Sequence, residues 1–399
     1  MGPGILTGFQ KSWQVRTERP VSYDIVCRHD LFHPDNDALL VTRDDRGGQR
    51  RFVVVDSQIM AHYGDAIENY FQANDINACI HPFEAGEYNK SVSQYLAVLE
   101  GLDAFPINRR NEPIIAIGGG VVTDLVGFVA SSWRRGVPHI NVPTTLMGYV
   151  DAAIGVKTGI NFQQHKNRLG SFSPPERVLL DHTFFQTLPH RHLLNGVGEI
   201  LKLAIVKEPE LFATLELYGS DCINAQFQDK TGWEILSTAV ESMLAELVPN
   251  LFETELARVV DFGHTFSTAL EMQDKLDLLH GEAVVIDMLL SSIIAWQRSL
   301  LSRNDLERIF SLVLTLRLPL SSEGLAPDLL MRSLMERQHH RNGVQRVPLP
   351  MGIGSYCFVA NIGLEDVTRA VIFFKEWLQD NYYGNEIQNP TRIFQYRPC

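Results

Sequence analysis

The chain has 399 residues, 45% hydrophobic and 21% charged, a composition that excludes a fibrous or largely disordered protein. Because a typical domain has about 150 residues, this length predicts two or at most three domains. The formal net charge of −12 argues against nucleic acid or an anionic membrane surface as the main partner.

The N-terminus, the apolar runs and the cysteines indicate a soluble protein of the cytoplasm. Residues 1–15 have no basic stretch followed by an apolar core, so we expect no secretory signal. The most apolar run, residues 114–133, contains a glycine triplet and Asp124, which argues against a membrane span. The five cysteines are scattered and form no C-x-x-C pair, which favours a reducing compartment and excludes a thiolate zinc site.

The first half of the chain alternates short β-rich runs with helical stretches. We expect strands at 51–56, 78–81 and 113–117, and helices at 61–74 and 91–102. This alternation is typical of a largely parallel sheet covered by helices.

The second half of the chain has a helical period throughout and is expected to be all-helical. The expected helices are 192–206, 233–247, 282–299, 304–316, 327–336 and 365–379. We place the boundary between an α/β domain, 1–185, and a helical domain, 186–399, near residue 185. The first fifteen or so residues and the tail after Asn381 are expected to be loosely packed.

A glycine triplet, Gly118, Gly119 and Gly120, follows the expected strand 113–117 and precedes a helix. Glycines let a ligand approach the backbone closely, and a helix N-terminus offers free N–H groups to a phosphate. The triplet is not the G-x-G-x-x-G dinucleotide motif, and a tight strand-to-helix turn without a ligand would use the same residues.

A basic cluster follows the glycine triplet. Between 133 and 168 there are five Lys or Arg residues and one acid, Asp151, in a protein that is acidic as a whole. We expect an anionic partner there, most economically a phosphorylated small molecule, with a solvated basic surface as the alternative. The basic residues are Arg134, Arg135, Lys157, Lys166 and Arg168.

Glu199, His264 and His280 in the second half are candidate metal ligands. Two histidines and one carboxylate leave the fourth position of a zinc ion open, as in a catalytic site. Lys202 lies three residues after Glu199 and shares its helix face. The alternative is that these histidines are ordinary packed residues, since spacing across separate helices is not diagnostic.

Taken together, these segments resemble the sugar phosphate cyclases, the superfamily of dehydroquinate synthase. The resemblance extends from about Tyr23 to Val359. It is carried by Gly-Glu87-Tyr-Asn-Lys90, Gly118-Gly-Gly-x-x-x-Asp124, Pro-Thr144-Thr145, Asp151-x5-Lys157, His-Lys166-Asn167-Arg168, Gly-Glu199-x-x-Lys202, Gly-His264-Thr-Phe and His280-Gly-Glu.

The resemblance implies a Rossmann-like NAD-binding domain, a C-terminal helical metal-binding domain, and an active site between them. It implies zinc, or cobalt in its place, held by Glu199, His264 and His280, and a homodimeric assembly. The NAD contacts that it implies are Asp56, Glu87, Lys90, Gly118, Gly119, Gly120, Val121, Val122, Asp124, Thr144, Thr145, Lys157, Lys166, Phe184 and Thr187.

The activity implied is the cyclisation of a phosphorylated sugar, with NAD used and regenerated in one turnover. A ring hydroxyl is oxidised, phosphate is eliminated, the ketone is reduced again, and an aldol step closes the carbocycle. Metal polarises the reacting oxygen, and cationic side chains stabilise the leaving phosphate. The residues expected to act on the substrate are Lys157, Asp151, Lys202, Asn167, Asp261 and Arg135.

Departures from dehydroquinate synthases indicate a different substrate. Those enzymes have basic residues before the Gly-His motif that bind a substrate carboxylate, whereas residues 242–257 contain no Lys or Arg. Asp261 stands where they have Asn, and Thr268 where they have a second His. This pattern resembles the subfamily that cyclises sedoheptulose 7-phosphate, above all the 2-epi-5-epi-valiolone synthases.

Arg346 stands where these synthases usually have His, which keeps 2-epi-valiolone open as the product. Demethyl-4-deoxygadusol synthase and 3-dehydroquinate synthase are further cyclase alternatives. Two hypotheses lie outside the cyclases. One is a metal-dependent polyol dehydrogenase, which would release NADH, and the other is an NAD-binding scaffold without activity.

Overall fold

The structure is a computed structural model that describes residues 12–18, 20–41, 48–163, 165–273, 275–339 and 341–383. Most of the two termini that we expected to be loosely packed, residues 1–11 and 384–399, lie outside these ranges. Within the described N-terminal stretch, Trp13 is 76% exposed and Val15 is 88% exposed. In the described ranges, no helix combines the length and apolarity that crossing a membrane requires.

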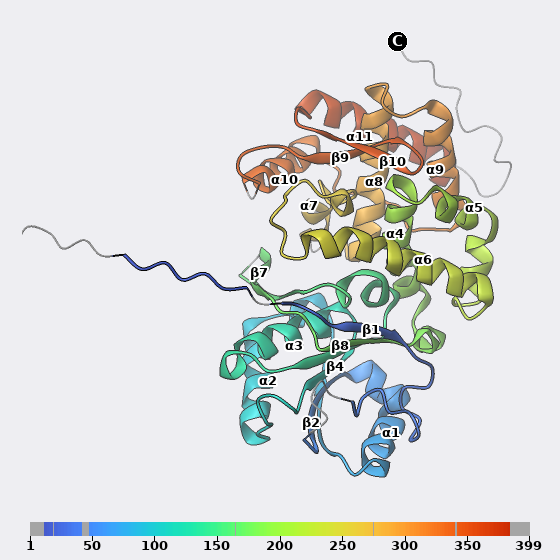
Figure 1. Ribbon diagram of the computed structural model, residues 1–399. Helices are drawn as coiled ribbons and strands as arrows, with labels where there is room; N and C mark the ends of the chain where they lie inside the picture. The colour runs from blue at the N-terminus through green and yellow to red at the C-terminus, as the bar shows by residue number, and fades with distance from the viewer. Residues whose placement is uncertain are drawn as a thin grey trace, which may run out of the picture.

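A six-stranded sheet with all its neighbouring strands parallel forms the first half of the molecule, as predicted (Figure 1). Its order is β1-β8-β5-β4-β2-β3. The strands are β1 (Asp24–Cys27), β2 (Arg50–Asp56), β3 (Asn77–Phe83), β4 (Ile114–Gly118), β5 (His139–Pro143) and β8 (Arg177–Leu180).

Helices cover both faces of this sheet because its central strands are apolar on both sides. The helix α1 (Ser57–Ala73) packs on the face that carries Val53 and Ile115. The helices α2 (Val92–Ala104) and α3 (Gly120–Ser132) pack on the opposite face, which carries Phe52 and Ile114.

The chain changes direction across the sheet between β2 and β4. From β2 the chain continues to β3 on one side, and from β3 it returns to β4 on the other side of β2. In open parallel sheets, ligands bind beyond the carboxyl ends of the strands at such a switch point. Here the two strands end at Asp56 and Gly118.

The hairpin of β6 (Lys157–Phe162) and β7 (His165–Phe172) was not among the expected elements. The strand β6 packs on α3, and β7 lies at the junction with the helical half (Figure 1). Gly159 and Gly170 face each other in this hairpin, where a Cβ on either would lie within 2.7 Å of the opposite backbone. The hairpin therefore depends on two glycines that a motif-based interpretation assigns no role.

The second half is built around α8 (His280–Gln297), which is buried on nearly all sides, since fifteen of its residues are buried. Five expected helices are confirmed with shifts of one to three residues at their ends, and the expected helix 282–299 is α8 itself. The surrounding helices are α4 (His190–Val206), α5 (Pro209–Asn224), α6 (Lys230–Leu247), α7 (Ser267–Glu271), α9 (Arg303–Thr315), α10 (Pro327–His339) and α11 (Leu364–Leu378). Among these, α5 and α7 were not predicted.

The prediction that the second half is all-helical is wrong in one place. The strands β9 (Val347–Gly352) and β10 (Ser355–Val359) form an antiparallel hairpin. Proline is tolerated here because both strands of a two-stranded hairpin are edge strands. The change from sheet to helices falls between β8 and α4, where the expected boundary near 185 lies in η4 (His182–Thr187). The division into two domains itself stays a prediction.

Candidate active site

The glycine triplet forms the turn from β4 into α3, at the switch point of the sheet. A Cβ on Gly118 would lie 2.6 Å from Cγ2 of Val122 and 3.3 Å from Cβ of Asp56, so the turn has no room for a side chain. Gly119 is the N-cap of α3 and offers no side-chain cap. The first turn of α3 therefore has N–H groups suited to an anionic ligand.

Thr144 and Thr145 follow the neighbouring strand β5 and lie against the glycine turn. The backbone N–H of Thr144 donates to the carbonyl of Gly118 over 3.0 Å. The hydroxyl of Thr145 accepts a hydrogen bond of 3.1 Å from the N–H of Gly148, which opens η3 (Gly148–Ala152). This short segment carries Asp151, so one continuous stretch leads from the sheet edge to the helical half.

The loop after β3 and the β6–β7 hairpin are tied together by polar side chains. The ammonium group of buried Lys90 contacts the carboxylate of Asp124 and is 2.5 Å from Oδ1 of Asn167. Glu87 accepts a hydrogen bond of 2.8 Å from Asn161 and lies 3.8 Å from Nζ of Lys166. The structure thus brings five of the predicted cofactor and substrate residues to one place.

Phe184 and Thr187 lie in η4 and contact α1. The ring of Phe184 is 2% exposed, and its centroid lies 5.3 Å from that of Tyr63. The hydroxyl of Thr187 is 3.2 Å from the Tyr63 hydroxyl. Since the Phe184 ring is part of the core, only its backbone is available for the cofactor contact that was predicted.

The three candidate metal ligands lie together, although they come from three separate segments. Glu199 belongs to α4, His280 begins α8, and His264 lies in the loop before α7. Each offers a ligand atom, and these atoms lie within 4.8 Å of one another. Nε2 of His280 is 3.4 Å and Nε2 of His264 is 3.7 Å from Oε1 of Glu199. This donor set fits a zinc ion that keeps one position open.

Buried charges surround these ligands. The ammonium group of Lys202 contacts the Glu199 carboxylate, one turn along α4. Burial alone would raise the pKa of Glu199, but Lys202 and the two histidines hold it well below its ordinary value. Burial opposes the charge of Lys202 as well, and Glu199 and Asp151 outweigh it, so the pKa of Lys202 is raised. For Asp151, burial outweighs the attraction of Lys202, and its pKa is raised.

The two histidines are oriented by different groups. Nδ1 of His264 lies 3.1 Å from the carbonyl oxygen of Phe262, and Nδ1 of His280 lies 3.1 Å from Oε1 of Glu271. Burial and Lys202 lower the pKa of His264 to about 3, so its Nε2 can offer a lone pair at neutral pH. Burial would lower the pKa of His280 too, but Glu271 and Glu199 raise it to about 10. Sequence reasoning missed Glu271, for which the only signal was a carboxylate between the two histidines.

Asp261 is surrounded by arginines. Its carboxylate lies 2.6 Å from Arg258 and 2.9 Å from Arg337, and it contacts Arg341. Burial opposes ionisation, but the guanidinium groups of Arg337 and Arg258 hold the pKa of Asp261 well below its usual range. A carboxylate paired in this way positions cations, here the guanidinium groups of the three arginines.

The sequence pattern gave no sign of these three arginines. Arg258 directly follows the stretch 242–257 that lacks basic residues. Its guanidinium contacts Glu253 as well as Asp261, so it is committed to carboxylates of the protein itself. The expectation of a substrate without a carboxylate is consistent with that arrangement.

Lys157 and Arg135 lie in very different surroundings. The side chain of Lys157 is 60% exposed, and its ammonium group lies 3.1 Å from Glu253. Desolvation by the surrounding protein and the positive charge of Arg258 lower the pKa of Lys157. Arg135 is exposed in η2 (Trp133–Arg135), beyond the C-terminal end of the 13-residue helix α3. At 1.5 Å per residue, α3 carries the chain roughly 20 Å from the glycine turn. Within one chain, the structure does not bring Arg135 to the other predicted residues.

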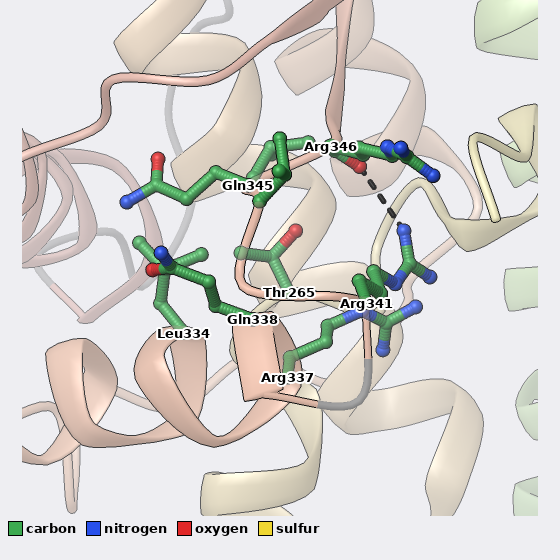
Figure 2. Close-up of a pocket in the computed structure, with 9 residues that line it drawn as sticks. Thr265, Leu334, Arg337, Gln338, Arg341, Gln345 and Arg346 are labelled. Carbon is green, nitrogen blue, oxygen red and sulfur yellow. Dashed lines mark hydrogen bonds between the residues drawn. The ribbon is translucent and has the colours of Figure 1, made fainter.

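A small cavity beside Thr265 is lined in part by Arg346. Figure 2 shows the guanidinium groups of Arg337, Arg341 and Arg346 on one side of it, with Gln345 and Leu334 on the other. Arg341 donates a hydrogen bond of 3.1 Å to the carbonyl of Arg346. The cavity has a volume of about 10 Å³, enough for one water-sized molecule. The unusual Arg346 therefore neighbours the arginines that hold Asp261.

A parallel sheet with a glycine turn at its switch point, joined to a helical half with a two-histidine, one-carboxylate site, defines a class of nucleotide- and metal-dependent enzymes. Two sequence families match the chain, 3-dehydroquinate synthase N-terminal over residues 80–195 and 3-dehydroquinate synthase C-terminal over 196–340. The chain belongs to this family, the sugar phosphate cyclases of the dehydroquinate synthase type, and the predicted resemblance is confirmed.

Three relatives show where in the family the chain lies. It is 44% identical to a 2-epi-5-epi-valiolone synthase of Streptomyces albus, over 92% of this chain and 91% of the relative. It is 32% identical to a demethyl-4-deoxygadusol synthase of Trichormus variabilis, over 97% and 95%. The solved structure of ValA, a 2-epi-5-epi-valiolone synthase from Streptomyces hygroscopicus subsp. jinggangensis 5008 with NAD+ and Zn2+ bound, matches with a TM-score of 0.87 at 41% identity, over 91% of this chain and 99% of that chain.

Proposed function

We propose that this protein is a sedoheptulose 7-phosphate cyclase that forms 2-epi-5-epi-valiolone and releases phosphate. The observation that carries the proposal is the 44% identity to a 2-epi-5-epi-valiolone synthase over nearly the whole chain. The identity to a demethyl-4-deoxygadusol synthase is 32%, which makes that activity the weaker candidate. The overall reaction is a redox-neutral elimination of phosphate with ring closure, so it needs no external oxidant or reductant.

NAD and zinc are the proposed cofactors, as in the ValA structure, with cobalt as an alternative metal. When bound, NAD would take up and return a hydride, and the metal would polarise the oxygen at the oxidised carbon. Glu199, His264 and His280 would hold the metal, since they offer three ligand atoms within 4.8 Å. The glycine turn and the uncapped start of α3 support a nucleotide phosphate at the sheet edge.

Lys202 and Asp151 are the proposed polar partners of the reacting oxygen. The ammonium group of Lys202 contacts the Glu199 carboxylate, and Asp151 interacts electrostatically with both, attracted by Lys202 and repelled by Glu199. A fixed ammonium group stabilises negative charge that develops on a neighbouring oxygen. Lys157, which interacts electrostatically with Asp151 and Asp261, is the proposed partner of the substrate phosphate. For Asn167, its place beside Lys90 supports a role at the cofactor side of the site.

Arg346 supports a second candidate product, 2-epi-valiolone. The side chain lines the cavity that Arg337 and Arg341 also line, next to the carboxylate of Asp261. The replacement of a histidine by a permanently charged guanidinium there changes the hydrogen bonds that a folding open-chain ketose can make. Arg346→His would then shift the product towards 2-epi-5-epi-valiolone.

The test is incubation with sedoheptulose 7-phosphate, NAD and zinc, followed by NMR of the cyclitol and measurement of released phosphate. We expect one phosphate for each cyclitol and no lasting absorbance of NADH. Accumulation of NADH would instead identify a polyol dehydrogenase. Release of phosphate from the heptulosonate substrate of dehydroquinate synthase, but not from sedoheptulose 7-phosphate, would contradict the proposed substrate.

A homodimer in the cytoplasm is also part of the proposal. The scattered free cysteines support the cytoplasm. Family membership supports the homodimer, and so does the position of Arg135, which is exposed and distant from the site of its own chain. Light scattering of the purified protein would test the assembly.

A further inference from the structure

Glu271 contacts both halves of the molecule at once. Its Oε1 lies 3.1 Å from Nδ1 of His280, in the helical half. Its Oε2 accepts a hydrogen bond of 2.7 Å from Nζ of Lys166, in the β6–β7 hairpin. The Glu271 side chain is only 5% exposed, so salt and water screen these two interactions little. The residue is the last of α7, a five-residue helix between His264 and His280.

The contact with Glu271 determines which nitrogen of His280 is available to a metal. A neutral imidazole carries one N–H, and an ionised carboxylate can only accept a hydrogen bond. In the neutral form that binds a metal, Glu271 therefore keeps the one proton of His280 on Nδ1 and leaves Nε2, which lies 3.4 Å from Oε1 of Glu199, as the nitrogen that faces the metal site. A carboxylate that is hydrogen-bonded to a metal-binding histidine orients that histidine and raises its affinity for the ion.

At its Nδ1, His264 is oriented by the backbone and not by a side chain. Its Nδ1 faces the backbone carbonyl of Phe262, two residues earlier, at 3.1 Å. Hence, within the described residues, the Nδ1 contact of His280, unlike that of His264, is with a group that also binds the first half of the protein. A movement of the hairpin would be transmitted to His280 through Glu271.

Lys166 connects Glu271 to the segment proposed to bind the nucleotide. The ammonium group that contacts Glu271 also lies 3.8 Å from Oε1 of Glu87, in η1 (Glu87–Asn89). That same oxygen accepts a hydrogen bond of 2.8 Å from Asn161 in β6. A nucleotide that orders this segment would therefore fix Lys166, and Lys166 would fix the carboxylate behind His280.

We propose that Glu271 is a positioning residue that holds His280 in its metal-binding tautomer and, through Lys166, couples metal loading to nucleotide binding. The inference rests on the proposed function only for the identity of the two ligands, zinc and NAD+. Coupling of this kind is reciprocal, so zinc must strengthen NAD+ binding by the same factor by which NAD+ strengthens zinc binding.

The first test measures zinc affinity, by competition with a chromophoric chelator, in metal-free wild type and in Glu271→Gln. The glutamine keeps the volume but loses the charge, and we expect zinc affinity to fall about 10- to 100-fold. The matched control is Glu246→Gln, which removes a carboxylate from an ion pair with Lys207, away from the site. It should bind zinc as wild type does. Wild-type affinity in Glu271→Gln would overturn the positioning role.

The second test measures NAD+ affinity by calorimetry with and without zinc. In wild type we expect zinc to strengthen NAD+ binding at least about fivefold. In Glu271→Gln and in Lys166→Met the ratio should approach one, whatever the absolute affinity for NAD+. A ratio of one in wild type, or an unchanged ratio in both variants, would overturn the coupling.

Neither measurement uses turnover, so the outcome is separate from that of the proposed reaction. A wild-type protein that binds both ligands but cyclises no sugar phosphate would contradict the proposed function and leave the coupling to be decided by the ratios. A wild-type protein without affinity for zinc would overturn the metal site and the coupling together.

Discussion

The charged groups of Glu199 and Lys202 contact each other one turn apart on α4, with side chains 0% and 2% exposed. Neither charge could be buried here alone at an acceptable energy, because a desolvated ion needs a partner. The contact therefore keeps a carboxylate ionised at the proposed metal site, and it holds an ammonium group beside the same site.

This contact predicts that Lys202→Met destabilises the metal-free protein more than the zinc-loaded protein. Removal of one partner leaves the other charge buried without compensation, which costs about 3–5 kcal/mol. A bound cation would replace the missing positive charge, so the loss should be smaller with zinc. The free energy of unfolding in urea, with and without zinc, measures both values. Equal losses under the two conditions would contradict the prediction.

His264→Ala and Glu199→Ala should each lose metal and turnover together. Both variants remove one of three protein ligands, and a site with two ligands holds zinc far less tightly. Metal analysis after dialysis, alongside phosphate release, measures the effect. The control is His62→Ala, which replaces an exposed histidine on α1 and should keep its zinc. Full activity in either ligand variant would show that the assignment of these ligands is wrong.

Much of the site could be predicted because its residues lie in short motifs with local causes. The glycine turn between β4 and α3 follows from a buried strand that ends in three glycines. The parallel sheet follows from the alternation of strands and helices. Glu199 and Lys202 share a helix face through their spacing alone.

The remaining parts depend on contacts between distant segments, which no local pattern specifies. Glu271 meets Lys166 across 105 residues, and Arg341 meets Asp261 across 80. The β9–β10 hairpin was missed because Pro348 and Pro350 argue against a strand, and only its edge position makes them acceptable.

Gly118→Ala should weaken NAD+ binding without unfolding the protein. The added methyl would lie 2.6 Å from Cγ2 of Val122, so the turn that presents the N-terminus of α3 has to shift. We expect at least a tenfold loss of NAD+ affinity by calorimetry, since each tenfold step corresponds to about 1.4 kcal/mol.

The control for Gly118→Ala is Gly64→Ala in α1. The nearest atom to a Cβ there is the flexible end of Met60, at 3.1 Å. This substitution should stabilise the helix by up to about 1 kcal/mol and leave NAD+ affinity unchanged. If Gly118→Ala bound NAD+ as tightly as this control, the nucleotide would not depend on the glycine turn.

His139 should make stability depend on pH in mildly acidic solution. The residue begins β5, is 1% exposed, and its Nε2 has no hydrogen-bond partner within the described part of the chain. Burial lowers the pKa of His139 from about 6.5 to about 4. Between these values the unfolded chain binds a proton that the folded protein does not, so stability is full above pH 6.5 and falls as the pH drops to 4.

The expected loss from this one group is roughly 3 kcal/mol by pH 4, since each unit of pKa difference corresponds to about 1.4 kcal/mol. His139→Phe keeps a ring in the core and cannot titrate, so its free energy of unfolding should fall less steeply over this interval. Urea unfolding of both proteins at a series of pH values, with chelator present, measures the difference between their slopes and cancels the other titrating groups. Above pH 7 the difference between the two proteins should be constant. Parallel curves from pH 7 down to 4 would mean that His139 is protonated as readily in the folded protein as in the unfolded chain.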